Sequence, residues 1–129
     1  MEIKILEKYR KILEDTFSGF PRGYCYDSSK ILEYFEGLKS VSGYFIPEGE
    51  YQNKSMWREH YWNEDKKSGL EFDITQDQFQ GINNKIIINK IGRGGLKKDK
   101  TVEKIFEQNY PNLKGYTNNI IKEIEKILI

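Results

Sequence analysis

Three residues of this sequence have side chains that could together carry out nucleophilic chemistry: Cys25, His60 and Asp73. Cys25 is the only cysteine of the chain, and His60 is its only histidine. A thiol becomes a strong nucleophile when a base takes its proton, and an imidazole works best as that base when a third group orients it. The sequence therefore offers a cysteine–histidine–aspartate triad, provided that folding brings the three side chains together.

The segment Gly23–Ser29 holds Cys25 immediately before a periodic apolar pattern, which is formed by Ile31, Leu32, Phe35 and Leu38. This spacing predicts a helix that runs to about Gly37, with Cys25 in its first turn. The unpaired N–H groups at the start of a helix stabilise a thiolate. A single cysteine is otherwise more often a small buried apolar residue. We interpret Asp27 as support for the helix start.

Two segments further along the chain alternate in the way that strands do. Between Trp57 and Asn63 the pattern puts His60 and Trp62 on one face. Between Leu70 and Ile74 the apolar residues face the core and Asp73 faces away from it. The polar segment between the two strands is predicted as a turn.

A hairpin made of these strands would pair the candidate base with its orienting group. If Asn63 lies opposite Leu70, residues 64–69 form the loop and His60 lies opposite Asp73. Their Cβ atoms would then be about 4.5–5.5 Å apart. The carboxylate could hold one imidazole nitrogen and so fix the tautomer. A lone histidine on a strand is otherwise a satisfied surface or cleft residue.

The remaining segments complete an α+β fold, in which an antiparallel sheet packs against the cysteine-bearing helix and further helices flank it at both ends. Residues 1–129 fit one domain. The further elements predicted are a helix over residues 3–17, strands at Val41–Ile46 and Ile86–Ile88, a loop at Thr75–Gly81, a helix from an N-cap at Thr101 to near Pro111, and a last helix that opens at Thr117.

Four short motifs also resemble the core of the transglutaminase-like superfamily, a branch of the papain-like cysteine enzymes. They are Cys25-Tyr26-Asp27, Val41-Ser42-Gly43-Tyr44, His60-Tyr61-Trp62-Asn63-Glu64 and Phe72-Asp73-Ile74-Thr75. The resemblance covers about residues 20 to 80 and is to short, divergent bacterial members. Family members commonly have a small residue in place of Tyr61, a proline in place of Ile74 and an alanine near Ser29.

The resemblance implies a papain-like fold in which Cys25 is the nucleophile, His60 the base and Asp73 the orienting group. The expected activity is acyl transfer from an amide through a thioester, as in thiol proteases, other amide hydrolases, deamidases and transglutaminases. The backbone N–H of Cys25 would bind the oxyanion. Tyr24, the Trp62 indole and a backbone amide are the candidates for a second donor, and we expect Tyr24 and Trp62 to contact the substrate. That substrate could be a peptide, a protein or a small amide.

Composition limits the other partners. Twenty-one basic and twenty acidic residues give a net charge of +1, which argues against a general attraction to nucleic acid or to a membrane. One histidine and one cysteine fall short of a typical zinc site, so we expect neither metal nor organic cofactor. The free thiol and the charged N-terminus lead us to expect a cytoplasmic protein. Oligomeric state, acyl donor and acyl acceptor stay open.

Two alternative functions follow from other features of the sequence. Residues 90–100 carry five basic residues and one acidic residue in a glycine-rich setting, which could bind the phosphates of nucleic acid. No Gly-Lys-Ser or Gly-Lys-Thr follows the glycines, so this loop does not match a phosphate loop. Alternatively, the chain is a catalytically inactive papain-like protein that acts through interaction or inhibition, with Cys25 buried or distant from His60.

Overall fold

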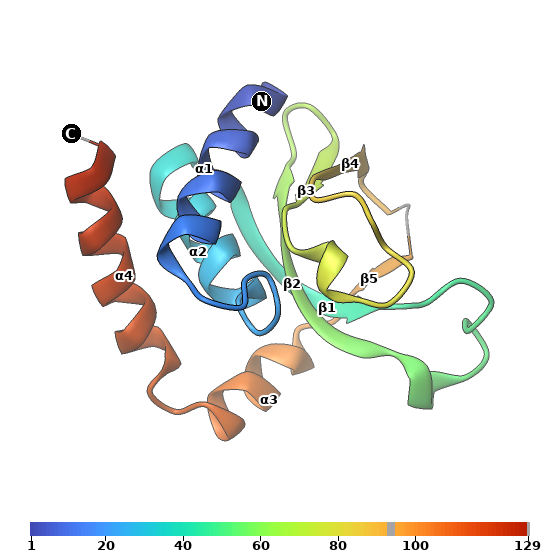
Figure 1. Ribbon diagram of the computed structural model, residues 1–129. Coiled ribbons are helices and arrows are strands. Elements are labelled where there is room, and N and C mark those ends of the chain that lie inside the picture. The colour runs from blue at the N-terminus through green and yellow to red at the C-terminus, as the bar shows by residue number, and fades with distance from the viewer. Residues whose placement is uncertain (93–94, 129) are drawn as a thin grey trace.

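The computed structural model describes residues 1–92 and 95–128, which form four α-helices and a five-stranded sheet (Figure 1). Every strand pair is antiparallel, and the strand order is β4-β3-β2-β1-β5. The α+β class predicted from the sequence is therefore confirmed. The helices are α1 (Ile3–Thr16), α2 (Cys25–Glu36), α3 (Thr101–Asn109) and α4 (Leu113–Leu128), and the strands are β1 (Lys39–Phe45), β2 (Arg58–Asp65), β3 (Leu70–Asp73), β4 (Ile87–Lys90) and β5 (Leu96–Lys98).

Helix α2 begins at Cys25 and packs against the sheet, as the apolar spacing predicted. Ile31 and Leu32 on its inner face are fully buried. The helix ends at Glu36, and the capping residue Gly37 adopts the left-handed conformation with φ of 69° and donates its N–H to the Glu33 carbonyl. Glycine is the usual residue at this position because it has no Cβ to clash there.

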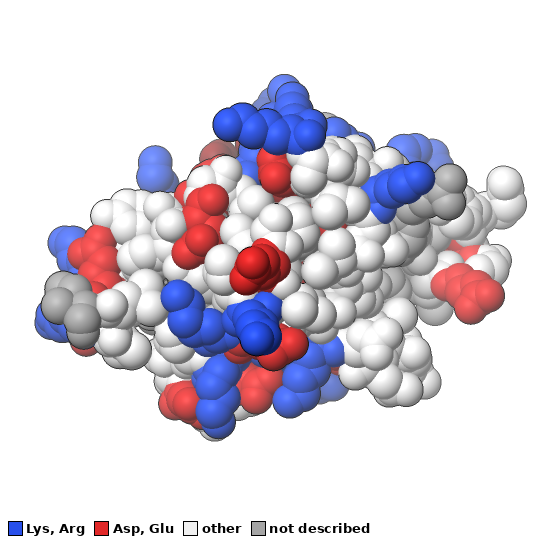
Figure 2. Space-filling model, turned by 90° about the horizontal axis from the view of Figure 1, so that it is seen from above, with Lys and Arg blue, Asp and Glu red and all other residues white. Residues whose placement is uncertain are grey.

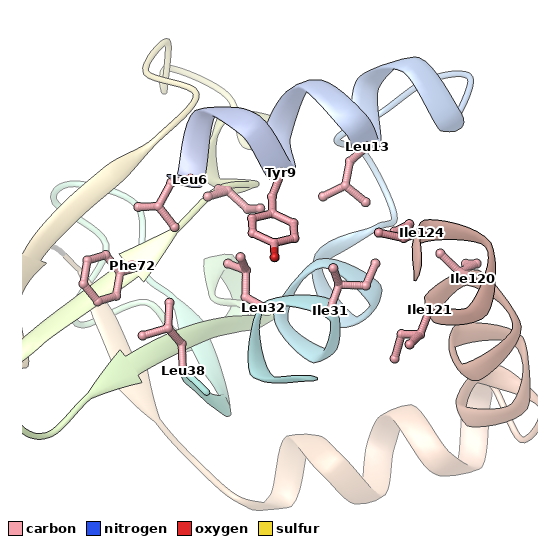
Figure 3. Close-up of a cluster of buried hydrophobic side chains, with 11 residues drawn as sticks. Leu6, Tyr9, Leu13, Ile31, Leu32, Leu38, Phe72, Ile120, Ile121 and Ile124 are labelled. Atoms are coloured by element: carbon pink, nitrogen blue, oxygen red, sulfur yellow. The ribbon is translucent and has the colours of Figure 1, made fainter. Parts of the chain in front are cut away.

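One large apolar core lies between the helices and the sheet (Figure 3). Helices α1, α2 and α4 all contribute to it, so the N- and C-terminal helices flank the cysteine-bearing helix. Phe72 of β3 contributes from the sheet, together with Leu38 just before β1 and Ile74 just after β3. The helical members of this core are Leu6, Tyr9 and Leu13 from α1, Ile31 and Leu32 from α2, and Ile120, Ile121 and Ile124 from α4.

The opposite face of the sheet is also buried. Trp62 packs there with Val41, Phe45 and Leu96, and Phe79 covers them from the segment that follows β3. The rings of Phe45 and Phe79 stack at 4.3 Å. In Figure 1 this segment, drawn yellow, crosses the side of the sheet away from α1 and α2. Both faces of β2 are therefore shielded from water over residues 60–64.

The register predicted for the β2–β3 hairpin is wrong by two residues. Asn63 pairs with Phe72, and Asp65 pairs with Leu70. The turn is therefore shorter than predicted, and His60 and Asp73 are not directly opposite. Side chains alternate between the two faces with a period of two, so a shift of two residues keeps His60 and Asp73 on the same face. A shift of one would have separated them.

Two predicted helix starts are also corrected. Thr101 is the first residue of α3 and not its N-cap, because the Asp99 carboxylate accepts hydrogen bonds from the Thr101 N–H at 2.9 Å and from its hydroxyl at 2.6 Å. Helix α4 begins at Leu113, four residues before Thr117. Thr117 is buried and hydrogen-bonded to the Asp27 carboxylate, which ties α4 to the start of α2.

Charged side chains of both signs lie interspersed on the face that Figure 2 shows. This distribution matches the near-zero net charge. Within residues 1–92 and 95–128, no helix has the length and apolar character needed to cross a bilayer.

Gly43 provides a test of how closely β1 and β5 approach. A Cβ at this position would collide with the Lys97 carbonyl oxygen and would lie 2.8 Å from the Lys98 Cα. Because both contacts are with backbone, Gly43→Ala should lower the free energy of unfolding by more than about 2 kcal/mol. Gly115→Ala is the matched control: nothing lies near its Cβ, and alanine has the higher helix propensity. Urea denaturation measures both, and equal stability of the two variants would contradict the close packing.

Candidate active site

A buried ion pair joins two of the three predicted triad residues. Nε2 of His60, on β2, lies 2.7 Å from Oδ2 of Asp73, at the end of β3. His60 is fully buried, and Asp73 is 2 % exposed. The two-residue register shift makes these residues diagonal neighbours on one face of the sheet, where long side chains still meet. The predicted contact therefore exists, although the predicted pairing does not.

The segment after β3 satisfies the remaining lone pairs of Asp73. Its Oδ1 accepts hydrogen bonds from the Thr75 N–H at 3.1 Å and from the Thr75 hydroxyl at 3.4 Å. Its Oδ2 accepts a second bond, from Nε2 of Gln76 at 3.0 Å. An Asp-x-Thr sequence commonly forms such a local turn, so the pattern Asp73-Ile74-Thr75 itself indicates this contact. Asp73 is held in one orientation.

Arg10 fastens this segment to α1. Its guanidinium forms two hydrogen bonds to the Asp77 carboxylate, at 2.6 and 2.8 Å, and another to the Ile74 carbonyl at 2.8 Å. Nε of Arg10 also bonds to Glu14 at 2.7 Å. Arg10 is 5 % exposed, and its bidentate pairing fixes both the position and the orientation of the loop. Nothing in the local sequence indicated this long-range contact.

The other nitrogen of His60, Nδ1, does not contact Asp73. Among the described residues, Nδ1 of His60 has no hydrogen-bond partner of good geometry. The Cys25 thiol is nevertheless near enough to act on the imidazole and raise its pKa. One imidazole therefore bonds to a carboxylate through Nε2 and has the Cys25 thiol nearby.

The electrostatics of the pair favour a protonated imidazole. Burial on its own lowers the pKa of His60, but the charge and hydrogen bond of Asp73, with a further contribution from Cys25, outweigh burial and raise it. An opposite charge in contact stabilises the charged form in this way. An imidazolium formed here would thus be stabilised.

The start of α2 offers backbone donors beside the thiol. The first helical hydrogen bond of α2 is that from the Ser28 N–H to the Tyr24 carbonyl, at 3.0 Å. The N–H groups of Cys25, Tyr26 and Asp27 precede that bond, and such groups are the ones that bind anions at helix starts. Asp27 is itself buried, and burial raises its pKa to about 6 against the opposing hydrogen bond from Thr117. Its contact with Thr117 supports the helix start, as we interpreted it.

Cys25 is largely covered. It is 7 % exposed and packs with Tyr61 of β2 and Val102 of α3, with Tyr26 and Phe106 against the same cluster. Residues 60 and 61 are neighbours on β2, so their side chains leave opposite faces of the strand. Cys25 packs with Tyr61, and it also contributes to the raised pKa of His60.

The structure also locates the two residues expected to contact substrate. Tyr24 is the N-cap of α2 and stacks on Phe17 at 4.5 Å, so it lies beside the thiol but within an aromatic group of its own. Trp62 is 1 % exposed and belongs to the buried cluster on the far face of the sheet. Its indole lies 6.0 Å from the imidazole of His60. Trp62 is therefore buried beside the histidine and does not line an open cleft.

The basic segment 90–100 is partly engaged within the fold. Lys97 lies over the Trp57 ring at 5.2 Å, and Lys98 forms an ion pair with Glu64 at 3.1 Å. Leu96–Lys98 is strand β5, which differs from the loop predicted there. Arg93 lies outside the described residues.

The described residues contain no group of three or more histidine, cysteine, aspartate or glutamate side chains that could hold a metal ion. Comparisons of the chain with protein-family models, with curated proteins and with solved structures gave no match.

The His60–Asp73 pair can be tested directly. Asp73→Asn should lower the pKa of His60, because it removes the charge that outweighs burial. Nitrogen NMR of the imidazole measures this without ambiguity, since the chain has one histidine. In the wild type, the raised pKa contributes stability that is fully present below about pH 6.5 and is lost as the pH rises through the folded value. Asp15→Asn, on the exposed face of α1, is the control; an equal pKa in both variants would contradict the pairing.

Two further carboxylates, those of Glu64 and Glu71, lie on the face of the sheet that holds Asp73. Glu71 pairs across the strands with Glu64, and burial, followed by the charge of Glu64, raises the pKa of Glu71 to about 7. The folded pKa exceeds the usual value, so stability falls as the pH rises from about 4.5 to 7. Glu71→Gln should therefore gain about 1–2 kcal/mol at pH 8 and much less at pH 5. Denaturation at both pH values measures this, with exposed Glu59→Gln as control; a gain independent of pH would contradict the assignment.

Proposed function

We propose that this protein is a cysteine-dependent acyl-transfer enzyme with a papain-like, transglutaminase-like core, in which Cys25 is the nucleophile, His60 the base and Asp73 the orienting group. The observation that carries the proposal is the buried His60–Asp73 bond of 2.7 Å at Nε2, in an imidazole whose pKa the Cys25 thiol helps to raise. A structural histidine could be satisfied at both nitrogens, whereas this one lacks a well-formed bond at Nδ1 within the described chain. The order of the three groups supports the proposal further.

The first half of the reaction forms a thioester. The proton of the Cys25 thiol passes to Nδ1 of His60, and Asp73 stabilises the resulting imidazolium through Nε2. The thiolate attacks the carbonyl carbon of an amide, and the N–H of Cys25 at the start of α2 binds the oxyanion. His60 then gives its proton to the leaving amine as the carbon–nitrogen bond breaks. The acyl group remains on sulfur.

The second half regenerates the enzyme. A water molecule or an amine attacks the thioester while His60 accepts its proton, and that proton returns to the thiolate as the carbon–sulfur bond breaks. Water yields a carboxylic acid, and an amine yields a new amide. Hydrolase, deamidase and transglutaminase activities all use these steps, with a peptide, a protein or a small amide as acyl donor.

The burial of the site favours a second candidate function, a catalytically inactive papain-like interaction protein. Cys25 is 7 % exposed and His60 is fully buried, so an acyl donor reaches the sulfur only if the covering side chains move. The nearest covering groups are Tyr61 and Val102. An inactive relative needs no such movement. The two candidates therefore differ in whether the thiol reacts in the folded protein.

Alkylation of Cys25 by iodoacetamide, followed by mass spectrometry, separates the two. The active enzyme should react rapidly at about pH 6–7, because His60 holds the proton of the thiol. His60→Ala should lower the rate at this pH by about tenfold or more. Cys25 is the only thiol, so the modified site is unambiguous.

Glu59→Gln, an exposed change on the same strand, should leave the alkylation rate unchanged. Slow alkylation that rises only above about pH 8.5, in the wild type and in His60→Ala alike, would reject the triad. A folded protein that does not react at any pH, but reacts fully in urea, would favour the inactive protein.

A further inference from the structure

We infer that the groove between α2, α3 and α4 binds a small organic cation, an ammonium group carried on an apolar or aromatic body. The groove has a volume of about 710 Å³, within the range that holds small ligands. Its walls include aromatic rings from three parts of the chain: Tyr26 on α2, Tyr61 on β2, and Phe106 and Tyr110 on and just after α3. This inference does not depend on the proposed acyl transfer.

The aromatic walls of the groove pack against one another, some of them at steep angles. Tyr61 meets Tyr26 edge-on at 5.0 Å and Phe106 at 4.9 Å, with interplanar angles of 81° and 72°. Tyr26 and Phe106 are nearly parallel at 6.3 Å, and Tyr110 lies 5.7 Å beyond Phe106. The negative quadrupole of an aromatic ring face attracts a cation.

A cation of the chain already occupies part of this position. Nζ of Lys30 lies 5.5 Å from the centre of the Tyr26 ring and 6.0 Å from that of Tyr61. Both distances are within the range of a cation–π contact. The Lys30 ammonium shows that the site suits this kind of group, and a ligand ammonium would take its place.

Carboxylates give the groove the matching charge. Glu33, Glu103 and Glu107 line it, against two ammonium groups, those of Lys30 and Lys114. Behind the lining, Asp27 is buried against Thr117, which is itself a wall residue. Burial raises the pKa of Tyr26, and so do Asp27, Glu107, Glu103 and Glu33, which means that all four carboxylates act on this ring.

Phenethylamine and phenylacetate form a matched pair of probes, since they have the same ring and opposite charges. In NMR titrations of the full chain, phenethylamine should cause saturable shifts of α2 and α3 signals, and phenylacetate should bind at least about tenfold more weakly. Equal or tighter binding of phenylacetate would overturn the inference. The absence of saturable shifts up to about 10 mM phenethylamine would also overturn it.

Two variants sharpen the test. Lys30→Met removes the competing ammonium, so phenethylamine should bind about fivefold more tightly. Glu107→Gln removes an exposed carboxylate and should weaken binding about twofold to fivefold, whereas Glu123→Gln, outside the groove, should change nothing. Glu107 is exposed, so its replacement does not endanger folding. Unchanged or weaker binding to Lys30→Met would contradict the assigned position of the cation.

Discussion

A carboxylate buried in the middle of a small domain constrains the structure around it. Transferring an ionised group out of water is costly unless hydrogen bonds and an opposite charge replace its hydration. Asp73 receives both, from Thr75 and Gln76 on its own segment and from His60 on the neighbouring strand. The segment that supplies these bonds is fixed in turn by Arg10 on α1. The hydrogen bonds that stabilise the buried Asp73 carboxylate, and the Arg10 contacts that fix their segment, thus connect the first helix to the end of the third strand.

The His60–Asp73 pair must be kept out of water, and this explains why both faces of the sheet are covered. Antiparallel sheets often leave one face in water, but here water would reach the His60–Asp73 pair from that side and weaken it. Trp62 and Phe79 close the face that carries the pair. On the other face, Nδ2 of Asn63 bonds to the Ser29 and Leu38 carbonyls at 2.8 and 3.1 Å, which joins β2 to α2 and to the residue before β1. Neighbouring residues of one strand therefore include His60 and the residue that holds the cysteine-bearing helix.

The sequence predicted those features that depend on local periodicity. The extent of α2 followed from the apolar spacing and from Gly37, and the common face of His60 and Asp73 followed from strand alternation. The register itself depends on how tightly the chain turns between Asp65 and Leu70, which the polar composition of that turn does not determine.

Features that depend on packing between distant segments could not be predicted. Thr117 looked like a helix start because hydroxyl residues favour N-caps, yet its hydroxyl bonds to Asp27, ninety residues away in the chain. Trp62 looked like a cleft wall because nothing in β2 indicates that Phe79 and Leu96 cover it. The sequence also does not indicate that α3 covers Cys25, because Val102 and Phe106 only form the apolar spacing of their own helix.

Tyr61 connects the groove to the candidate active site. Its ring forms one wall of the groove and packs in the same cluster as Cys25, while the preceding residue, His60, acts on the same thiol. Because strand residues alternate, β2 turns an aromatic ring toward the helices and an imidazole toward the opposite face. Tyr61, which packs on Cys25, and Asp73, which raises the pKa of His60, therefore lie on opposite sides of β2.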